Sequence, residues 1–550
     1  MLRITEIKLP LDHADNALKT AIATRLCIAE ADITDFSIFK RGTDARKREA
    51  ILFVYTIDAI VKNETSLLRK LKNDKRVSAT PITSYKFVAH ATQSNSKIHN
   101  QKLRPIIVGF GPAGIFAALI LAQSGFKPLV LERGKAVRER TKDTWGMWRK
   151  GELNPESNVQ FGEGGAGTFS DGKLYSQIKD PNFYGRKVLH EFVKAGAPEE
   201  ILYLSHPHIG TFKLVSMVEA MRANIIELGG EIRFESRVDD IAIDHDKIQG
   251  VTLTSGEYIA TNHLILAIGH SARDTFEMLH KRGIYVEAKP FAIGFRIEHP
   301  QSLIDEARYG NNYDQIQKKI GAADYKLVHH AENGRAAYSF CMCPGGTVVA
   351  AASEVGRVVV NGMSQYSRNE RNANSGIVVG IDPVDFEPDY IGDPTTNPLA
   401  GMALQRKLES HAFVLGGSNY QAPAQLVGDF LNATPSTKFG AVQPSYTPGV
   451  SLGDLTTALP EYAIRAIREA LPAFAKQIKG YDLPDALLTG IETRTSSPIR
   501  IKRHDHTMQS INTQGLYPTG EGAGYAGGIL SAAVDGIRVA EAVALSLVNS

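Results

Sequence analysis

A strand–helix–strand unit with a glycine-rich first turn constrains the fold of this chain more than any other feature. The run PIIVGFGPAGIFAALILAQSGFKPLVLERG begins at Pro105. Its apolar residues 105–110 predict a buried parallel strand, and residues 113–124 predict a helix that Gly125 ends. Residues 127–132 predict the second strand. Two parallel strands joined by a helix indicate the α/β class.

The three glycines of the turn have separate roles. Gly109 makes the tight turn, Gly111 lets a pyrophosphate approach the backbone, and Gly114 lets the helix pack against the strand. A pyrophosphate there would meet unpaired N–H groups at the positive end of the helix dipole. Glu132 ends the second strand, where an acid binds a ribose hydroxyl pair and repels a 2′-phosphate. The pattern predicts an adenine-dinucleotide site that does not take NADP, and the alternative is a turn that only packs.

Composition excludes several classes of protein. A length of 550 residues allows three or four domain-sized units, and 43% hydrophobic with 22% charged residues argues against wholesale disorder. The formal net charge of +3 gives no overall case for a nucleic-acid or membrane partner. We find no signal-peptide pattern and no apolar run near the roughly 20 residues of a membrane span. With 3 cysteines a disulfide framework is excluded, and we expect a cytoplasmic protein.

We expect residues 1–95 to form a separate ferredoxin-like α+β domain. The pattern is strand, helix, strand, strand, helix, strand, the split βαββαβ order. The expected elements are the strand 2–9, the helix 17–27, the strands 34–41 and 50–61, the helix 64–73 and the strand 84–89. The polar residues 92–101 predict a linker to the next domain.

The hairpin tip between the central strands of this domain, residues 40–49, is strongly basic. A solvated tip explains this charge without a partner. The alternative is an anionic partner such as RNA, which the cluster of Arg46, Lys47 and Arg48 would attract. Nucleic acid therefore stays a minor alternative to a small-molecule partner, and no membrane partner is expected.

A second glycine-rich segment, NVQFGEGGAGTFSDGKLYS, spans residues 158–176. Its glycines lie between Gly162 and Gly172 and would let the backbone approach a flat or phosphorylated ligand. The alternative is a flexible surface loop, against which the apolar Phe161 and Phe169 argue. The elements expected next are the helix 211–228, the strand 231–237, the hairpin 247–260 and the strand 261–269.

This order of motifs, together with "ERG", "LILAIGH" and the segment 515–543, resembles the glutathione-reductase-like FAD-binding fold. In that fold a late strand ends at an acidic residue that binds the ribityl chain of FAD, and the next helix N-terminus faces the pyrimidine carbonyl of the flavin. Glu521 matches the acid, where Asp is commoner, and Gly527, Gly528 and Ile529 match the helix start. A helix dipole in this place stabilises negative charge on a reduced flavin.

More narrowly, the full-length chain resembles a bacterial family of FAD-dependent dehydrogenases of unassigned substrate. The segments that carry this resemblance are EIKLPLDH, FGEGGAGTFSDGKLYSQIKDPNFYGRK, YSFCMCPGG and ETRTSSP. The resemblance implies FAD as the cofactor. The cofactor-binding residues that we expect are Gly109, Gly111, Pro112, Ala113, Gly114, Glu132, Arg133, Gly165, Val238, Ala267, Gly269, Gly520, Glu521, Gly528 and Ile529.

Two FAD motifs so far apart in the chain require a large insertion between them. We expect a glutathione-reductase-like FAD-binding Rossmann domain made of residues 102–284 and 488–550, with an α+β cap domain inserted at residues 285–487. The substrate would bind in the cleft between the cap and the flavin.

Within the cap, Cys341 and Cys343 are two positions apart in a strand-rich stretch, so we expect both side chains on one strand face. A redox pair is sterically conceivable, although closing a disulfide within a strand is strained. The alternative is small buried residues beside the turn at 344–346. No ligand-spaced histidine follows the pair, so we expect no zinc or other metal site.

The catalytic candidates are Cys343, Arg494 and His208. Arg494 could fix an anionic substrate or a reduced flavin, and His208, like His206, precedes a predicted helix where it could touch substrate. For each histidine the alternative is a hydrogen-bonded structural role. Other polar residues that could line the cavity are Arg368, Asn372 and Asn374.

We expect an FAD-dependent oxidoreductase, a dehydrogenase, that acts on a small substrate. No second GxGxxG unit follows Val238, so NAD(P)H could serve only as a transiently bound electron donor. The alternatives are an RNA-modifying flavoprotein and a non-catalytic protein in which FAD is structural. The sequence does not specify the substrate, the electron partners, the direction of reaction or the oligomeric state.

Overall fold

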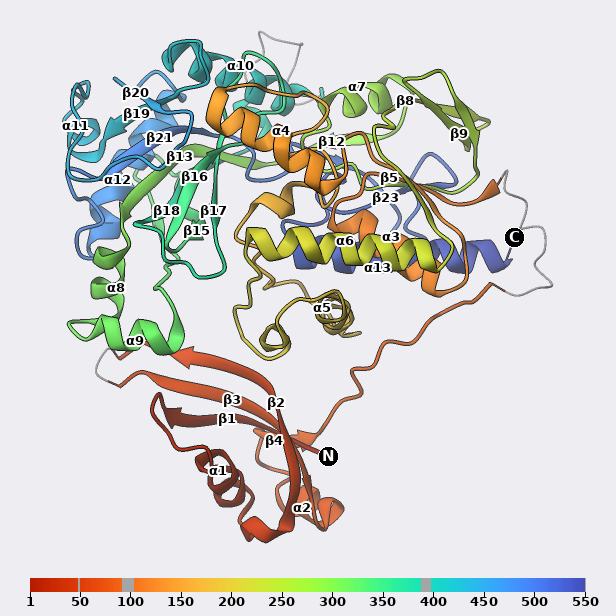
Figure 1. Cartoon of the computed structure of the whole chain (residues 1–550), viewed down its shortest axis with the longest axis vertical. Helices are drawn as coiled ribbons and strands as arrows, with labels where there is room; N and C mark the ends of the chain where they lie inside the picture. The colour runs from red at the N-terminus through yellow and green to blue at the C-terminus, as the bar shows by residue number, and fades with distance from the viewer. Residues whose placement is uncertain (48–49, 92–102, 387–396, 550) are drawn as a thin grey trace.

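The computed structural model describes residues 1–47, 50–91, 103–386 and 397–549, and Figure 1 shows how their helices and strands are arranged. The first part of the chain forms a four-stranded antiparallel sheet with the order β2-β3-β1-β4, and two helices pack on it. Its elements are β1 (Leu2–Pro10), α1 (Ala17–Leu26), β2 (Ile33–Asp44), β3 (Leu52–Val61), α2 (Glu64–Lys70) and β4 (Val77–Ala79). They follow the order βαββαβ.

A five-stranded parallel sheet with the order β23-β11-β5-β6-β7 follows. Its strands are β5 (Ile106–Val108), β6 (Leu129–Leu131), β7 (Glu231–Arg233), β11 (Leu264–Leu266) and β23 (Leu516–Pro518). Helices α3 (Pro112–Gln123), α6 (Thr211–Glu227) and α13 (Ile529–Asn549) lie side by side, α3 against each of the other two (Figure 1). The predicted α/β class is therefore confirmed.

Both faces of this sheet are buried. Ile107 of β5 packs with α3, α6 and α13, whereas Ile106 and Val108 pack on the opposite side. That side is covered by the antiparallel strands β8 (Val238–Asp244), β9 (Lys247–Leu253) and β10 (Tyr258–Ala260) and by α7 (Arg273–Lys281). Burial on both faces explains why the first strand is apolar at every position in the sequence.

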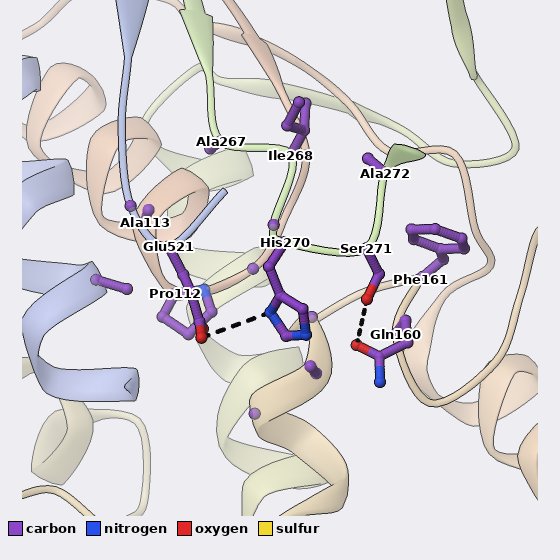
Figure 2. Close-up of a pocket in the computed structure, with 18 of the residues that line it drawn as sticks. Pro112, Ala113, Gln160, Phe161, Ala267, Ile268, His270, Ser271, Ala272 and Glu521 are labelled. Carbon is purple, nitrogen blue, oxygen red and sulfur yellow. Dashed lines mark hydrogen bonds and ion pairs between the residues drawn. The ribbon is translucent and has the colours of Figure 1, made fainter. Parts of the chain in front are cut away.

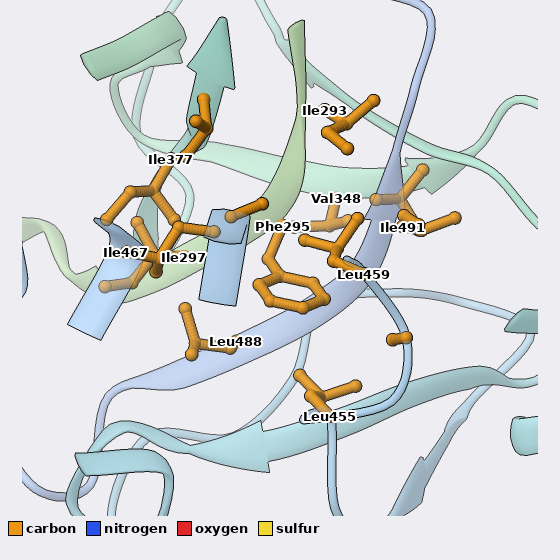
Figure 3. Packing of buried hydrophobic residues seen from close by; sticks show 14 of the residues in the cluster. Ile293, Phe295, Ile297, Val348, Ile377, Leu455, Leu459, Ile467, Leu488 and Ile491 are labelled. Atoms are coloured by element: carbon orange, nitrogen blue, oxygen red, sulfur yellow. The ribbon is translucent and has the colours of Figure 1, made fainter. Parts of the chain in front are cut away.

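Residues 291–492, which we call the cap, contain a seven-stranded sheet with the order β14-β15-β18-β13-β21-β19-β20. Phe295 and Leu488, on neighbouring strands of this sheet, and Ile467 of a covering helix belong to one apolar cluster (Figure 3). The strands are β13 (Phe291–Pro300), β14 (Val328–His330), β15 (Ala336–Cys343), β18 (Asn372–Ile381), β19 (Ala422–Leu426), β20 (Val450–Leu452) and β21 (Leu487–Glu492), and the hairpin of β16 (Gly346–Ala350) and β17 (Val360–Ser364) lies beside them. The cap helices are α8 (Gln301–Tyr309), α9 (Tyr313–Ile320), α10 (Ala400–Leu415), α11 (Val427–Leu431) and α12 (Glu461–Ala475).

The predicted insertion, residues 285–487, ends at the first residue of β21, a strand of the cap sheet. It begins just before β12 (Val286–Ala288), which pairs with β22 (Ile499–Ile501) outside the cap. The remaining helices are α4 (Val137–Lys150) and α5 (Tyr184–Lys194). Among the helices of the described residues, none combines the length and apolarity that crossing a membrane requires.

The last strand of the N-terminal unit is not where the sequence predicts it. Residues 84–89 are not a strand, and β4 lies before them. Tyr85 and Phe87 instead pack against the apolar cluster that contains α13, and the Tyr85 hydroxyl donates to Glu541 at 2.9 Å. The apolar alternation in this stretch therefore reflects contact with a distant helix and not pairing in a sheet.

The basic hairpin tip expected at residues 40–49 is only partly described. Arg46 forms an ion pair with Asp44 at 2.6 Å, so one cation of the tip is already paired within the hairpin itself. Arg48 and the expected linker at residues 92–101 lie outside the described residues.

Helix α13 lies directly against the start of α3 because a glycine faces the contact. A Cβ atom at Gly536 would lie 2.2 Å from the carbonyl oxygen of Ala113, so no larger residue fits while the helices keep this distance. Ala113 belongs to the glycine-rich turn at which α3 begins. The contact therefore fixes the turn relative to the C-terminal helix.

We expect Gly536→Ala to destabilise the protein by about 1–3 kcal/mol, because the added methyl group forces two packed helices apart. Gly146, inside α4, provides the matched control, since the nearest atoms to its added Cβ lie 3.8 Å away. Gly146→Ala should stabilise by up to about 1 kcal/mol through helix propensity. Calorimetric unfolding of both variants measures the difference, and equal effects would contradict the close helix contact.

Candidate functional site

A cavity of about 390 Å³ lies where the parallel sheet meets the cap. Residues that directly follow β5, β6, β11 and β23 line it, so it is at the carboxyl edge of the sheet. Phe340, Cys341 and Asn361 line it from the cap. The carboxyl edge is where ligands bind in open parallel sheets of this kind.

The structure brings nearly all of the expected cofactor residues to this cavity. Those that line it are Gly109, Gly111, Pro112, Ala113, Glu132, Arg133, Gly165, Val238, Ala267, Gly269, Gly520, Glu521, Gly528 and Ile529. Gly114 does not line it. A Cβ atom at Gly114 would lie 2.0 Å from the carbonyl oxygen of Gly109, which makes it the glycine at which helix and turn pack together.

The first glycine-rich turn presents a free helix N-terminus to the cavity. Gly109 has a φ of +98°, and a Cβ there would lie 2.4 Å from the carbonyl oxygen of Ala267, so the turn requires glycine. Helix α3 begins with Pro112, a residue favoured at this position because it has no N–H to leave unpaired. No side chain of the described residues caps this N-terminus. Its N–H groups can therefore receive an anionic group such as a phosphate.

Glu132 joins the two glycine-rich segments. Its carboxylate accepts backbone N–H bonds from Phe110 at 2.8 Å, from Gly134 at 2.9 Å and from Gly162 at 2.9 Å, and the residue is buried. A carboxylate has about four acceptor positions, so one remains for a ribose hydroxyl group. The sequence predicts that Glu132 binds a ribose, but it does not reveal that the same carboxylate holds the two glycine-rich segments together.

The second glycine-rich segment is held in place by Arg140 of α4. This fully buried guanidinium donates to the carbonyl oxygens of Asn158 at 2.8 Å, Val159 at 2.8 Å and Glu163 at 2.6 Å. Burial lowers the pKa of Arg140 to about 10, so the group stays charged at neutral pH. The alternative of a flexible surface loop is wrong, because the segment is buried and bonded along this stretch.

The start of α13 also lines the cavity. Added Cβ atoms at Gly527 and Gly528 would meet no atom within 4 Å, so both glycines face open space. Glu521 lies 3.5 Å from the Nδ1 atom of His270, as Figure 2 shows. In the described part of the chain, the buried Nε2 atom of the same histidine has no hydrogen-bond partner. It is available to a group bound in the cavity.

Sequence reasoning missed several residues that line the cavity. His270 and Ser271 directly follow Gly269, and their position after a parallel strand could have indicated them. Ser271 donates to the side-chain oxygen of Gln160 at 3.1 Å (Figure 2). Lys173 lies in the second glycine-rich segment, yet nothing local in the sequence shows that it reaches the cap.

Arg494 lines the cavity, but protein groups already hold its guanidinium. It donates to Glu409 at 3.0 and 3.1 Å, to Ser271 at 3.0 Å and to Ser353 at 2.7 Å. Glu409 also accepts from Arg273 at 2.7 and 2.9 Å. Burial alone would raise the pKa of Glu409, but the two arginines outweigh it and hold that pKa well below its usual range. This cluster joins the cap helix α10 to α7 next to the parallel sheet.

His208, a catalytic candidate, lies outside the cavity. Its Nε2 atom is 3.0 Å from the carbonyl oxygen of Tyr366, and its ring stacks on the Tyr366 ring. Burial lowers the pKa of His208. These contacts favour the hydrogen-bonded structural role. His206 lies against Tyr175, a cavity residue, with ring centroids 4.6 Å apart.

The other polar candidates of the cap also lie outside the cavity. Arg368 forms an ion pair at 2.5 Å with Asp171, which itself lines the cavity. Asn374 accepts from the buried Arg296 at 2.9 Å, and Asn372 donates to a buried carboxylate at 2.9 Å. Asn372 and Asn374 belong to β18 and are buried within the cap.

The expectation that Cys341 and Cys343 share one face of a regular strand is wrong. The pairing of β15 with β18 shifts register between Phe340 and Cys343, and Cys341 has a left-handed φ of +43°. Cys341 lines the cavity, whereas Cys343 is fully buried and does not. The thiol that a ligand in the cavity can reach is therefore that of Cys341.

Comparison with known proteins adds two matches to described families. The family described as "FAD-dependent protein, C-terminal domain-like" matches residues 290–495, which contain the cap. A domain of unknown function matches residues 1–60.

Solved structures give weaker likenesses. L-Proline dehydrogenase from P. horikoshii is 12% identical, with 81% of this chain and 94% of that chain covered and a TM-score of 0.33. Glycine oxidase from Bacillus cereus is 12% identical, with 81% and 95% covered and a TM-score of 0.30. At such TM-scores, neither likeness carries an argument about this chain.

A relative from Clostridium beijerinckii gives a much stronger match. This protein, described only as uncharacterized, is 50% identical over 541 residues, which cover 98% of both chains. Identity at this level over the whole length means that the two proteins share the N-terminal unit, the glycine-rich segments and the cap. The chain belongs to the same family as this clostridial protein, and its cap matches the FAD-dependent C-terminal domain family.

Proposed function

We propose that this protein is an FAD-dependent oxidoreductase that binds FAD in the cavity and acts on a small molecule between the flavin and the cap. The observation that carries the proposal is the cavity itself. It extends from the free N-terminus of α3 and Glu132 to the start of α13, and fourteen of its lining residues were expected as FAD-binding residues in segments far apart in the chain. The match of the cap to an FAD-dependent domain family supports the same cofactor.

The residues present fit FAD at each part of the cofactor. The N–H groups at the start of α3 suit the pyrophosphate, and Glu132 suits the adenosine ribose. Glu521 and the unpartnered Nε2 atom of His270 suit the ribityl hydroxyl groups or the flavin edge. The glycines before α13 leave room for a flat ring at the positive end of that helix.

Bound FAD would supply two-electron redox chemistry, and the chain supplies binding, orientation and charge. Lys173 places a cation in the cavity wall. Burial alone would lower the pKa of Lys173, but Cys341, Cys343 and Asp171 outweigh it and raise that pKa, so the ammonium group stays charged. The family matches give no support to transient docking of NAD(P)H, and the proposal does not include it.

The cap would hold the substrate against the flavin only if its position is fixed. We infer that Arg494 is a positioning residue in this respect, because its donors bind Glu409, Ser271 and Ser353 instead of facing a substrate. Together with Arg273 it ties α10 of the cap to the rim of the parallel sheet.

The first test is whether the cavity binds FAD. Gly528→Leu adds a side chain that meets no protein atom at its Cβ and extends into the cavity. We expect the purified wild type to be yellow and the variant to bind FAD at least about tenfold more weakly, a loss of about 1.4 kcal/mol or more. Absorbance and quantification of released FAD measure both.

The matched control is Gly453→Leu, because the added Cβ at Gly453 also meets no atom within 4 Å and the residue does not line the cavity. This variant should bind FAD like the wild type. Folded wild-type protein that is colourless and takes up no added FAD would overturn the proposal.

A second test concerns the joint between cap and sheet. Glu409→Ala leaves the buried Arg273 and Arg494 without their shared anion, and we expect a loss of about 3–5 kcal/mol of stability. Glu354→Ala removes another partner of Arg273. The Glu354 side chain is 22% exposed, so the loss of stability should be clearly smaller, about 1 kcal/mol. Calorimetric unfolding compares the two, and similar losses would contradict the role given to Glu409.

A further inference from the structure

We propose that Cys341 and Cys343 form a thiol–disulfide redox couple in the cavity wall, with Cys341 as the thiol that attacks a small disulfide and Cys343 as the thiol that resolves the mixed disulfide. This names a substrate class, low-molecular-weight disulfides and thiols, for the cavity of the proposed function. The inference rests on the proposed function in one respect only, because the flavin would supply the electrons that reduce the Cys341–Cys343 disulfide again.

Cys341 lines the same cavity as the glycine-rich segments and the start of α13. Gly167 contacts Ile529 of α13, since a Cβ atom there would lie 2.9 Å from the Ile529 side chain. Lys173, a few residues after Gly167, reaches the cap, where its ammonium group donates to the carbonyl oxygen of Met342. The second glycine-rich segment thus links the start of α13 directly to the Cys341–Cys343 segment, and Cys341 lines the same cavity.

The backbone departs from a regular strand at the two cysteines. In a regular strand, residues two apart are held too far apart for an unstrained disulfide. Here the register of β15 shifts between Phe340 and Cys343, and the left-handed φ of +43° at Cys341 bends the chain. The Cys343 thiol donates to the carbonyl oxygen of Cys341 at 3.3 Å, so its side chain turns back toward the preceding cysteine.

A left-handed backbone costs a non-glycine residue of the order of 1 kcal/mol or more, and such strain is concentrated at functional sites. The alternative, that both cysteines are only small buried residues beside a turn, does not account for it. A cysteine used for packing needs neither this conformation nor a position in the wall of a cavity.

Two cations act on both thiols, and the interaction between the cysteines makes the thiols unequal. The buried guanidinium of Arg296 donates to the carbonyl oxygen of Cys341 at 2.9 Å and lies 4.0 Å from the Cys343 sulfur. The Cys343 thiol, and then Lys173 and Arg296, lower the pKa of Cys341 well below its usual range despite burial. The interaction with Cys341 and burial raise the pKa of Cys343. An accessible thiolate beside a protonated buried thiol is the arrangement of an attacking and a resolving cysteine.

The Glu492 carboxylate lies next to one of these two cations, because it forms an ion pair with Arg296 at 2.8 Å. Burial raises the pKa of Glu492 to about 7, although Arg296 opposes the shift. Lys173 provides a second cation next to Cys341, and its ion-pair partner in the described structure is Asp171 at 3.7 Å and not Glu492.

The exchange balances without any further reactant. The Cys341 thiolate attacks one sulfur of a small disulfide RSSR, so a Cys341–SR bond forms and RS⁻ leaves. Cys343 then loses its proton to the released thiolate and attacks the Cys341 sulfur, which forms the Cys341–Cys343 disulfide and releases the second RS⁻. The couple gives up two electrons, and one RSSR becomes two thiols. A two-electron reductant, for which the proposed flavin is suited, would return the couple to the dithiol.

The test uses the full-length protein with Cys27, the exposed third cysteine, changed to serine so that it cannot react. The protein is mixed with 4,4′-dithiodipyridine, and the released thione is counted by absorbance while peptide mass spectrometry identifies the product. We expect two thiones per chain and a peptide with Cys341 joined to Cys343. Cys343→Ser in the same background should release one thione and keep a stable adduct on Cys341.

Cys341→Ser should react at least about tenfold more slowly, because the remaining thiol is buried and protonated. If the Cys27→Ser protein instead keeps an adduct on each of the two cysteines, or does not react at all, the couple is overturned. Both readouts are independent of flavin. A colourless protein that forms the disulfide refutes only the proposed function, and a yellow protein that does not form it refutes only the couple.

Discussion

The cavity depends on one buried carboxylate. Glu132 follows the second strand of the parallel sheet and binds backbone N–H groups from both glycine-rich segments. Glycine-rich backbone is costly to order, because glycine loses more conformational freedom on folding than other residues. Charge-assisted hydrogen bonds to a buried acceptor, each worth about 1.5–3 kcal/mol, offset part of that cost. Arg140 does the same from the other side by binding carbonyl oxygens of the second segment.

The cap needs a corresponding anchor because it lies between two distant parts of the chain. Arg494 follows the last cap strand, and Arg273 begins the helix after β11, so both come from segments that enter or leave the cavity rim. Glu409 binds both of them from α10. A buried ion cluster of this kind adds little net stability compared with apolar packing, but removing its central anion is costly. Its consequence is a defined position of the cap over the cavity.

Much of the fold follows from local sequence signals. The first strand, helix and second strand of the parallel sheet lie within a few residues of the predicted bounds, because helix periodicity, apolar strands and glycine turns act over short distances. Local signals also identified the first cavity residues, from Gly109 to Glu132, whereas Glu521, Gly528 and Ile529 were expected from the resemblance to the FAD-binding fold. The errors have long-range causes. Residues 84–89 alternate like a strand because Tyr85 and Phe87 pack on α13, and nothing within the segment reveals a partner so far along the chain.

The cysteine pair shows the same limit at the level of the site. Spacing alone predicts one face for Cys341 and Cys343, whereas a bulge against β18 separates their environments and exposes only Cys341 to the cavity. The electrostatics then follow from the assembled fold. Helices α3 and α13 both direct their N-termini to the cavity, and Lys173 adds a buried cation that reaches the cap. A field of this sign favours a pyrophosphate at the start of α3 and negative charge on a reduced ring at the start of α13. It favours a thiolate at Cys341 for the same reason, so the proposed cofactor and the proposed redox couple rest on a common physical cause.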